Sequence, residues 1–192
     1  MKAFVLAASL AGLIAGAAHA ADVPLCQRTP AVAQFIVNQI NATQGAHKTC
    51  ADITADDLAS LNRVSVQGAH LTELKAGDFD GLPNLEILNI RSNDYTTLPE
   101  GLFKGLTKLK TLVIIGTKLR YFPDDFLADT PSLEQCYCFR NQVRSISESV
   151  FQRLEESTTL TALELDSQLQ PAEKARLEKL ASARPGIGLL LH

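Results

Sequence analysis

The stretch from Leu85 to Leu106 reads LEILNIRSNDYTTLPEGLFKGL, and its spacing of apolar residues recurs along the chain. It opens with the phrase Leu-x-x-Leu-x-Ile-x-x-Asn. Steps of 24 residues reach the start of each related phrase, at Leu61, Leu85, Leu109 and Leu133. A shortened fifth copy begins at Leu160. A repeat of this length predicts a stack of similar structural units.

Each repeat is expected to contain one short strand, because the apolar positions two residues apart face the same side of an extended chain. Parallel stacking of these strands would bury a continuous core that no single repeat could form. The second halves repeat as well, which places Phe79, Phe103, Leu127 and Phe151 in that core.

Asparagines follow two of the strands, at positions 93 and 141. A buried amide there can bond the backbone of adjacent turns. Ala69 and Thr117 take the same place in the other repeats, so we expect alternate turns to be held less firmly.

The pattern resembles the leucine-rich repeat family, whose unit is written L-x-x-L-x-L-x-x-N/C-x-L. The stretch Leu85–Leu106 is similar to its 24-residue typical subclass, and the resemblance covers residues 50 to about 168. ITADDLASL, residues 53–61, is similar to the helical N-terminal caps of internalin-like bacterial proteins. The resemblance implies an α/β repeat fold, a short solenoid with a parallel β-sheet on its concave face and helical caps at both ends.

The expected organisation has four parts. Residues 1–20 are a signal peptide, 21–60 a helical N-terminal cap, 61–159 four repeats, and 160–192 a fifth partial repeat with a C-terminal cap. In the caps, Thr29-Pro30 predicts the start of a helix over 30–41, and Thr54-x-x-Asp57 predicts a second, short one. Residues 171–183 predict a third helix, and 187–191 a final edge strand, with a disordered tail as the alternative.

The first twenty residues, MKAFVLAASLAGLIAGAAHA, have the composition of a secretory signal peptide. A single charge at Lys2 precedes an apolar run that ends in Ala18-His19-Ala20, which predicts cleavage before Ala21. A membrane anchor is disfavoured because the run is short and rich in Ala and Gly. The short charged region is typical of bacterial export, to the periplasm or the medium.

Four cysteines allow three pairings. Cys26 and Cys50 flank the first cap helix of a chain expected to be exported, where disulfides persist, so we predict that they pair. Cys136 and Cys138 replace two core positions of the fourth repeat and are expected to be buried thiols. A metal site at this Cys-x-Cys is the alternative, but further ligands are missing nearby.

The sequence predicts no catalytic, cofactor or metal site. Gly-x-Ser-x-Gly, His-Glu-x-x-His and phosphate-loop motifs are absent from the 192 residues, and the histidines after position 20 fall in separate parts of the stack. Asp78-Phe79-Asp80-Gly81 is interpreted as a solvated turn rather than a calcium loop. A net charge of −3 disfavours nucleic-acid binding, and a hydrophobic fraction of 46% excludes a disordered chain.

The strand positions between core residues are expected to point outward onto the concave face. There the repeats place an apolar group with arginines beside it, a composition typical of protein-recognition surfaces. The candidate partner-binding residues are Ile87, Arg91, Val113, Ile115, Tyr137, Phe139 and Arg140. Glu164 and Asp166 are expected at the rim beyond them.

The sequence therefore predicts an exported, non-catalytic module that binds a protein or peptide through its concave face, without nucleic acid and without stable membrane insertion. The alternative is a structural envelope protein that self-associates as a homodimer through the same surface. An enzyme or a carbohydrate binder is a third, weaker hypothesis, because the face carries few clustered aromatic and amide side chains.

Overall fold

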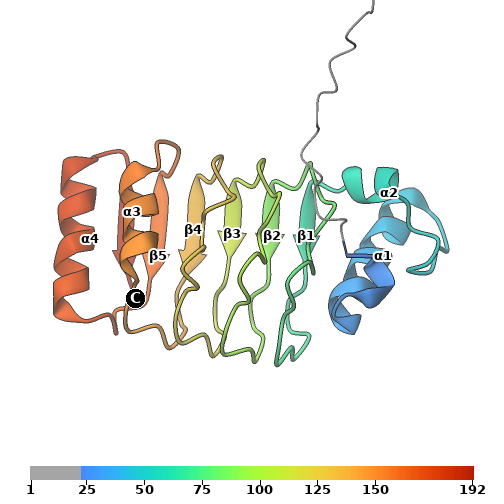
Figure 1. The fold of residues 1–192 in the computed structure, drawn as a ribbon, viewed down its shortest axis with the longest axis horizontal. Coiled ribbons are helices and arrows are strands. Elements are labelled where there is room, and N and C mark those ends of the chain that lie inside the picture. Colours follow the sequence, from blue (N-terminus) through green and yellow to red (C-terminus); the bar gives the residue numbers. More distant parts are fainter. Residues whose placement is uncertain (1–22) are drawn as a thin grey trace, which may run out of the picture.

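Short parallel strands, one from each repeat and one from the C-terminal end, build the sheet of this chain in a computed structural model that describes residues 23–192 (Figure 1). The signal peptide predicted for residues 1–20 lies outside the described residues. The strands lie side by side in chain order and form one sheet. They are β1 (Arg63–Ser65), β2 (Ile87–Asn89), β3 (Thr111–Val113), β4 (Gln135–Cys138), β5 (Ala162–Leu165) and β6 (Gly188–Leu191). This is the α/β repeat solenoid that the sequence predicts.

The register of the sheet aligns the repeats position by position, so the same inward side chain of each strand meets its counterpart. Leu88 pairs with Val64 on one side and Leu112 on the other, and the row continues through Cys136 and Leu163. All five side chains are buried. The continuous row is the core that no single repeat could bury by itself.

Phenylalanines fill the side of the core opposite the sheet, with one change from the predicted set. Phe126 is buried and stacks on Phe122 at 4.3 Å between ring centroids. Leu127, expected in the core, is only half-buried and has a φ of +69°. Phe126, one residue earlier, fills this part of the core, where its ring also lies edge-on to Phe103 at 5.8 Å between centroids.

The N-terminal cap consists of a 3-10 turn, η1 (Leu25–Gln27), and two helices, α1 (Pro30–Gln44) and α2 (Ala55–Ala59). Helix α1 begins at the predicted proline, runs three residues beyond position 41 and ends at Gly45 in the left-handed conformation. Helix α2 has the predicted capping box between Thr54 and Asp57. A disulfide joins Cys26 to Cys50, with Cα atoms 5.2 Å apart, and ties η1 to the loop after α1.

Asp78 is buried, contrary to the solvated turn expected from sequence. Its carboxylate accepts hydrogen bonds from the backbone N and hydroxyl of Thr29, at 2.7 and 2.8 Å, and from the backbone N of Lys75. Because Asp78 lies at the start of α1, groups from two segments donate hydrogen bonds to its carboxylate. These bonds offset the cost of burying a polar side chain. Asp78 thereby anchors the cap to the first repeat.

The C-terminal end carries two helices, α3 (Glu148–Glu156) and α4 (Pro171–Ala183), with β6 after them. Helix α3 replaces the irregular segment of earlier repeats and buries Phe151 and Leu154. Figure 1 shows α4 at the end of the stack opposite α1. Strand β6 pairs with β5, as the sequence predicts for 187–191.

The turn at Thr117, which lacks asparagine, is tied as well, so the expectation of a loose turn is wrong at this position. Asn141 donates from Nδ2 to the carbonyl of Ile114 and accepts from the backbone N of Thr117. At position 117 the threonine hydroxyl donates to Asn141 Oδ1 at 2.7 Å. The hydroxyl of Tyr95 supplies a further buried donor. At this turn the threonine hydroxyl and the Tyr95 phenol together replace the missing amide.

Candidate protein-binding face

The sheet presents an open face, defined as the strand side chains that point away from the core. Its central row follows from the strand register and reads Ser65, Asn89, Val113, Tyr137, Glu164 and Leu190. The next row, at the ends of the strands, contains Gln67, Arg91, Ile115 and Phe139, which backbone hydrogen bonds between adjacent repeats hold in line. Adjacent repeats thus bring predicted site residues together.

The predicted apolar residues form two neighbouring pairs, one pair in each row. Val113 pairs directly with Tyr137, while Gly116 N donates to the carbonyl of Phe139, beside Ile115. We call Val113, Ile115, Tyr137 and Phe139 the apolar patch. Each of them is half-buried in the sheet.

Ile87 lies outside this patch, in the third row of the face. It pairs with Thr111, whose hydroxyl donates to Gln135 Oε1 at 3.1 Å. The next two repeats therefore have polar side chains in this row. Ile87 lies at the margin of the predicted binding surface and is separate from the apolar patch.

The first two repeats carry a polar network on the open face. Arg91 donates from Nε to Gln67 Oε1 at 3.0 Å, and its backbone N donates to Asn89 Oδ1. Asn89 is buried by these contacts. Arg91 is thus engaged toward the first repeat, whereas the apolar patch belongs to the third and fourth.

Phe139 is covered by a residue that the sequence analysis did not assign to the face. The imidazole of His192 stacks on its ring, with centroids 3.9 Å apart and planes 17° from parallel. His192 Nε2 lies 2.7 Å from Glu164 Oε2, and its backbone is held to Leu165 and Ser167. Leu165 pairs with Leu191, so extending the register by one residue places His192 beside Asp166. The spacing of the two strands in the sequence could therefore have indicated that His192 lies at this face.

Leu190 is the second residue missed by sequence reasoning. It is 54% exposed and continues the central row beyond Glu164. Glu164 pairs with Leu190, so continuing the central row from β5 to β6 in the sequence would have identified this residue. Its exposure results from its place on the terminal strand of the sheet.

Asp166 does not lie at the rim, as the sequence suggested, but is only 4% exposed. Its Oδ1 accepts a hydrogen bond from the backbone N of Asn141 at 2.9 Å, which places it in the row of ladder asparagines. Oδ2 has no hydrogen-bond partner among the described residues. Burial raises the pKa of this carboxyl, and the backbone donors oppose that shift only in part.

The two other cysteines are buried thiols on β4, with Sγ atoms of Cys136 and Cys138 2.7 Å apart. Burial raises the pKa of the Cys138 thiol, and the neighbouring Cys136 adds to the shift. Across residues 23–192, no group of three or more His, Cys, Asp or Glu side chains is arranged to hold a metal ion.

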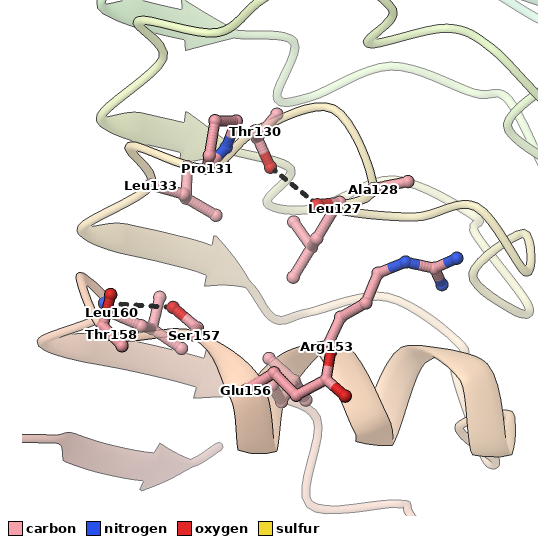
Figure 2. A pocket seen from close by; sticks show the side chains of 11 residues that line it. Leu127, Ala128, Thr130, Pro131, Leu133, Arg153, Glu156, Ser157, Thr158 and Leu160 are labelled. Carbon is pink, nitrogen blue, oxygen red and sulfur yellow. Dashed lines mark hydrogen bonds between the residues drawn. The ribbon is translucent and has the colours of Figure 1, made fainter.

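A pocket of about 380 Å³ lies between the loop before β4 and the end of α3 (Figure 2). Leu127, Leu133, Leu154 and Leu160 line it with apolar surface, and polar groups of α3 and the following turn complete it. Arg153 of this pocket donates to the carbonyls of Asp124 and Ser149, so the guanidinium fastens α3 to the preceding repeat. The pocket contains no predicted site residue.

No helix within residues 23–192 is long and apolar enough to cross a membrane.

Comparison with known proteins supports the same architecture. Residues 59–119 match the family model of the leucine rich repeat. A leucine-rich-repeat protein of Leptospira interrogans is 26% identical, with a TM-score of 0.56 over 71% of this chain and 33% of its own. An internalin (inlF) of Listeria monocytogenes is 20% identical, with a TM-score of 0.64 over 88% of this chain and 45% of its own.

The structure of the Toll–Spatzle complex of Drosophila also matches, at 24% identity and a TM-score of 0.51, over 58% of this chain and 14% of that one. This chain therefore spans less than half the length of each of these structures. No curated protein matches the sequence. The repeat motif, the ladder of buried amides and the parallel sheet agree with these matches: residues 59–119 are leucine-rich repeats, and the chain has a leucine-rich-repeat solenoid fold that an internalin shares.

Proposed function

We propose that this chain is an exported, non-catalytic module that binds a protein or peptide on the open face of its sheet. The apolar patch of Val113, Ile115, Tyr137 and Phe139 is the observation that carries the proposal. Grouped apolar and aromatic side chains beside exposed arginines are characteristic of protein-recognition surfaces. Tyr137 is the proposed central anchor, because it lies between Val113 and Glu164 in the middle row.

Other features support a protein ligand and an oxidising compartment. One structure of the same fold is a complex between Toll and Spatzle, and leucine-rich repeats commonly mediate contacts between proteins. The disulfide between Cys26 and Cys50 fits export, since such bonds persist outside the cytoplasm. Together with the signal peptide predicted over residues 1–20, this favours a periplasmic or secreted bacterial protein.

The test compares capture of partners by the mature protein and by variants of the patch. The patch variant carries Val113→Glu and Tyr137→Glu, and the control carries Ala128→Glu and Ala172→Glu, which add the same charge at exposed positions outside the sheet. Captured proteins are identified by mass spectrometry and then titrated directly. Binding by wild type and control, with loss in the patch variant, supports the proposal. Equal binding by all three folded proteins contradicts it.

A homodimer is the second candidate, favoured by Leu190, which is 54% exposed on the terminal strand. Apolar side chains exposed beside an unpaired strand edge are typical of surfaces that associate. Light scattering over a dilution series distinguishes the two functions. A dimer that persists on dilution and dissociates with Leu190→Lys favours self-association, and a monomer at all concentrations excludes it.

A further inference from the structure

Positive charge accumulates at the margin of the sheet where β3 and β4 end. Segments 115–121 and 139–145 contain four cationic residues and no acidic one, although the whole chain has 21 acidic and 18 basic residues. We call Lys118, Arg120, Arg140 and Arg144 the cationic edge. All four are exposed, and Tyr121, which follows Arg120, is 50% exposed.

The backbone holds the two segments side by side. Gly116 N donates to the carbonyl of Phe139 at 3.1 Å, and Gln142 N donates to the carbonyl of Leu119 at 2.7 Å. Arg120 and Arg144 occupy the same position in consecutive repeats. Neighbouring strands are about 4.8 Å apart, so the fold brings these like charges close together.

The chain itself neutralises little of this charge. Lys118 pairs with Asp94 at 2.8 Å, but the three arginines form no ion pair within residues 23–192. Carboxylates on neighbouring elements are engaged elsewhere or buried. Glu164 pairs with His192, and Glu173 accepts from backbone N–H groups. Asp166 is 4% exposed and accepts from the backbone N of Asn141. A set of exposed, uncompensated cations attracts an anionic ligand.

Arg140 connects the cationic edge to the apolar patch. It has a φ of +57°, and Gly68, Ser92 and Gly116, which hold the same position in the first three repeats, also have a positive φ. The left-handed conformation is unfavourable for a residue with a Cβ atom, and the turn that all four repeats share holds Arg140 in it. Its Cζ lies 5.8 Å from the centroid of the Phe139 ring.

We propose that the cationic edge binds carboxylate side chains of an acidic polypeptide segment, whose apolar side chains contact the apolar patch. This inference rests on the proposed function and specifies the chemistry of the partner. Guanidinium groups match carboxylates in a two-point geometry. An extended segment alternates its side chains, so it offers anionic and apolar groups together.

The probe for the test is a fluorescein-labelled synthetic peptide of alternating Glu and Tyr, titrated by fluorescence anisotropy. A peptide with Gln in place of Glu keeps the aromatic groups and removes the charge. Phosphatidylserine vesicles form a separate arm that detects a lipid source of anions. We expect the acidic peptide to bind at least about tenfold more tightly than the Gln peptide, with affinity falling as salt rises from about 50 to about 300 mM.

Two variants with the same change in net charge locate the site. Arg120→Glu with Arg144→Glu reverses the cationic edge, whereas Lys104→Glu with Lys179→Glu reverses two exposed cations elsewhere. The edge variant is expected to lose about tenfold or more in affinity for the acidic peptide relative to this control, while both retain the wild-type melting temperature. Equal affinity of the two variants, equal binding of the Glu and Gln peptides, or binding to vesicles alone would each overturn the proposal.

The same proteins separate this inference from the proposed function. If captured partners are lost with Val113→Glu and Tyr137→Glu but retained by the edge variant, the protein-binding function stands and the cationic edge is not part of it. If neither variant alters capture, the open face itself is not the binding surface.

Discussion

The hydroxyl of Tyr95 donates a hydrogen bond to the carbonyl oxygen of Ile90 at 3.0 Å, in the buried interior of the second repeat. In the fourth repeat, Asn141 donates to the corresponding carbonyl of Ile114 in the repeat before it. An asparagine at 117 would reach Ile90 in the same way, but the chain has threonine there. The phenol therefore supplies a bond that the repeat pattern assigns to an amide.

Replacing Tyr95 with Phe should destabilise the protein by about 1 kcal/mol, the usual contribution of one buried hydrogen bond. The loss is limited because Asn93 Nδ2 also donates to the Ile90 carbonyl. Burial raises the pKa of the Tyr95 phenol, so the donor proton is retained over the whole accessible pH range. Denaturant unfolding measures the change, and Tyr121→Phe at an exposed site is the control. Equal stability of both variants would show that the Tyr95 bond contributes nothing.

Replacing Asp166 with Asn should stabilise the protein at pH 7 by about 1 kcal/mol, because a neutral amide takes the place of a carboxylate whose charged form is disfavoured by burial. The folded pKa of Asp166 is raised, so the native state binds more protons than the unfolded chain above the ordinary carboxyl pKa. Stability contributed by this group therefore falls as the pH rises. The gap between variant and wild type should widen as the pH rises above the ordinary carboxyl pKa and level off above the raised folded pKa of Asp166.

Carboxyls with lowered pKa values, such as Asp57 beside Lys48, have the opposite pH dependence. They are present in both proteins, so they cancel in the difference between Asp166→Asn and wild type. Thermal unfolding across this pH range provides the measurement. A difference that stays constant with pH would show that Asp166 does not titrate differently in the folded state.

Replacing Arg140 with Gly should raise stability by about 1 kcal/mol, since glycine adopts a φ of +57° without strain. Part of the gain is offset by the greater freedom of glycine in the unfolded chain. The same change should weaken binding of the acidic peptide, because it removes one cation. Arg144→Gly is the control without a positive φ, and it should not stabilise. A loss of stability in Arg140→Gly would contradict the assignment of strain.

Replacing both Cys26 and Cys50 with Ser should lower the free energy of unfolding by about 3 kcal/mol, because the disulfide closes a loop and so restricts the unfolded chain. Unfolding in guanidinium chloride measures the loss, and reduced wild type should match the variant. Comparable stability of variant and oxidised wild type would mean that the cap holds without its crosslink.

The thiols of Cys136 and Cys138 should be unreactive in the native protein at pH 8. Both are buried, and the raised pKa of Cys138 leaves little thiolate to react. Titration with an aromatic disulfide reagent should detect them only after unfolding, with two equivalents per chain in total. Rapid reaction in the folded state would show that β4 opens to solvent.

Local patterns predicted the parts of the fold that depend on near neighbours in sequence. The 24-residue spacing gave the strands, their parallel order and the inward rows, because the same phrase must meet itself in adjacent repeats. Capping residues predicted the start of α1 at Pro30 and of α2 after Thr54. The disulfide followed from the positions of Cys26 and Cys50 around the cap helix.

The sequence by itself determined the repeat, its register and the rows of the open face in the first four repeats, since these follow from periodicity alone. Only the tertiary structure decided that Asp166 turns inward, that His192 covers Phe139 and that Asp78 anchors α1. Each of these contacts lies near one end of the repeat stack and joins a repeat to a segment that departs from the repeat pattern. At the ends of a solenoid, unpaired core and backbone must be covered by residues outside the repeat, and no periodic rule specifies which ones meet.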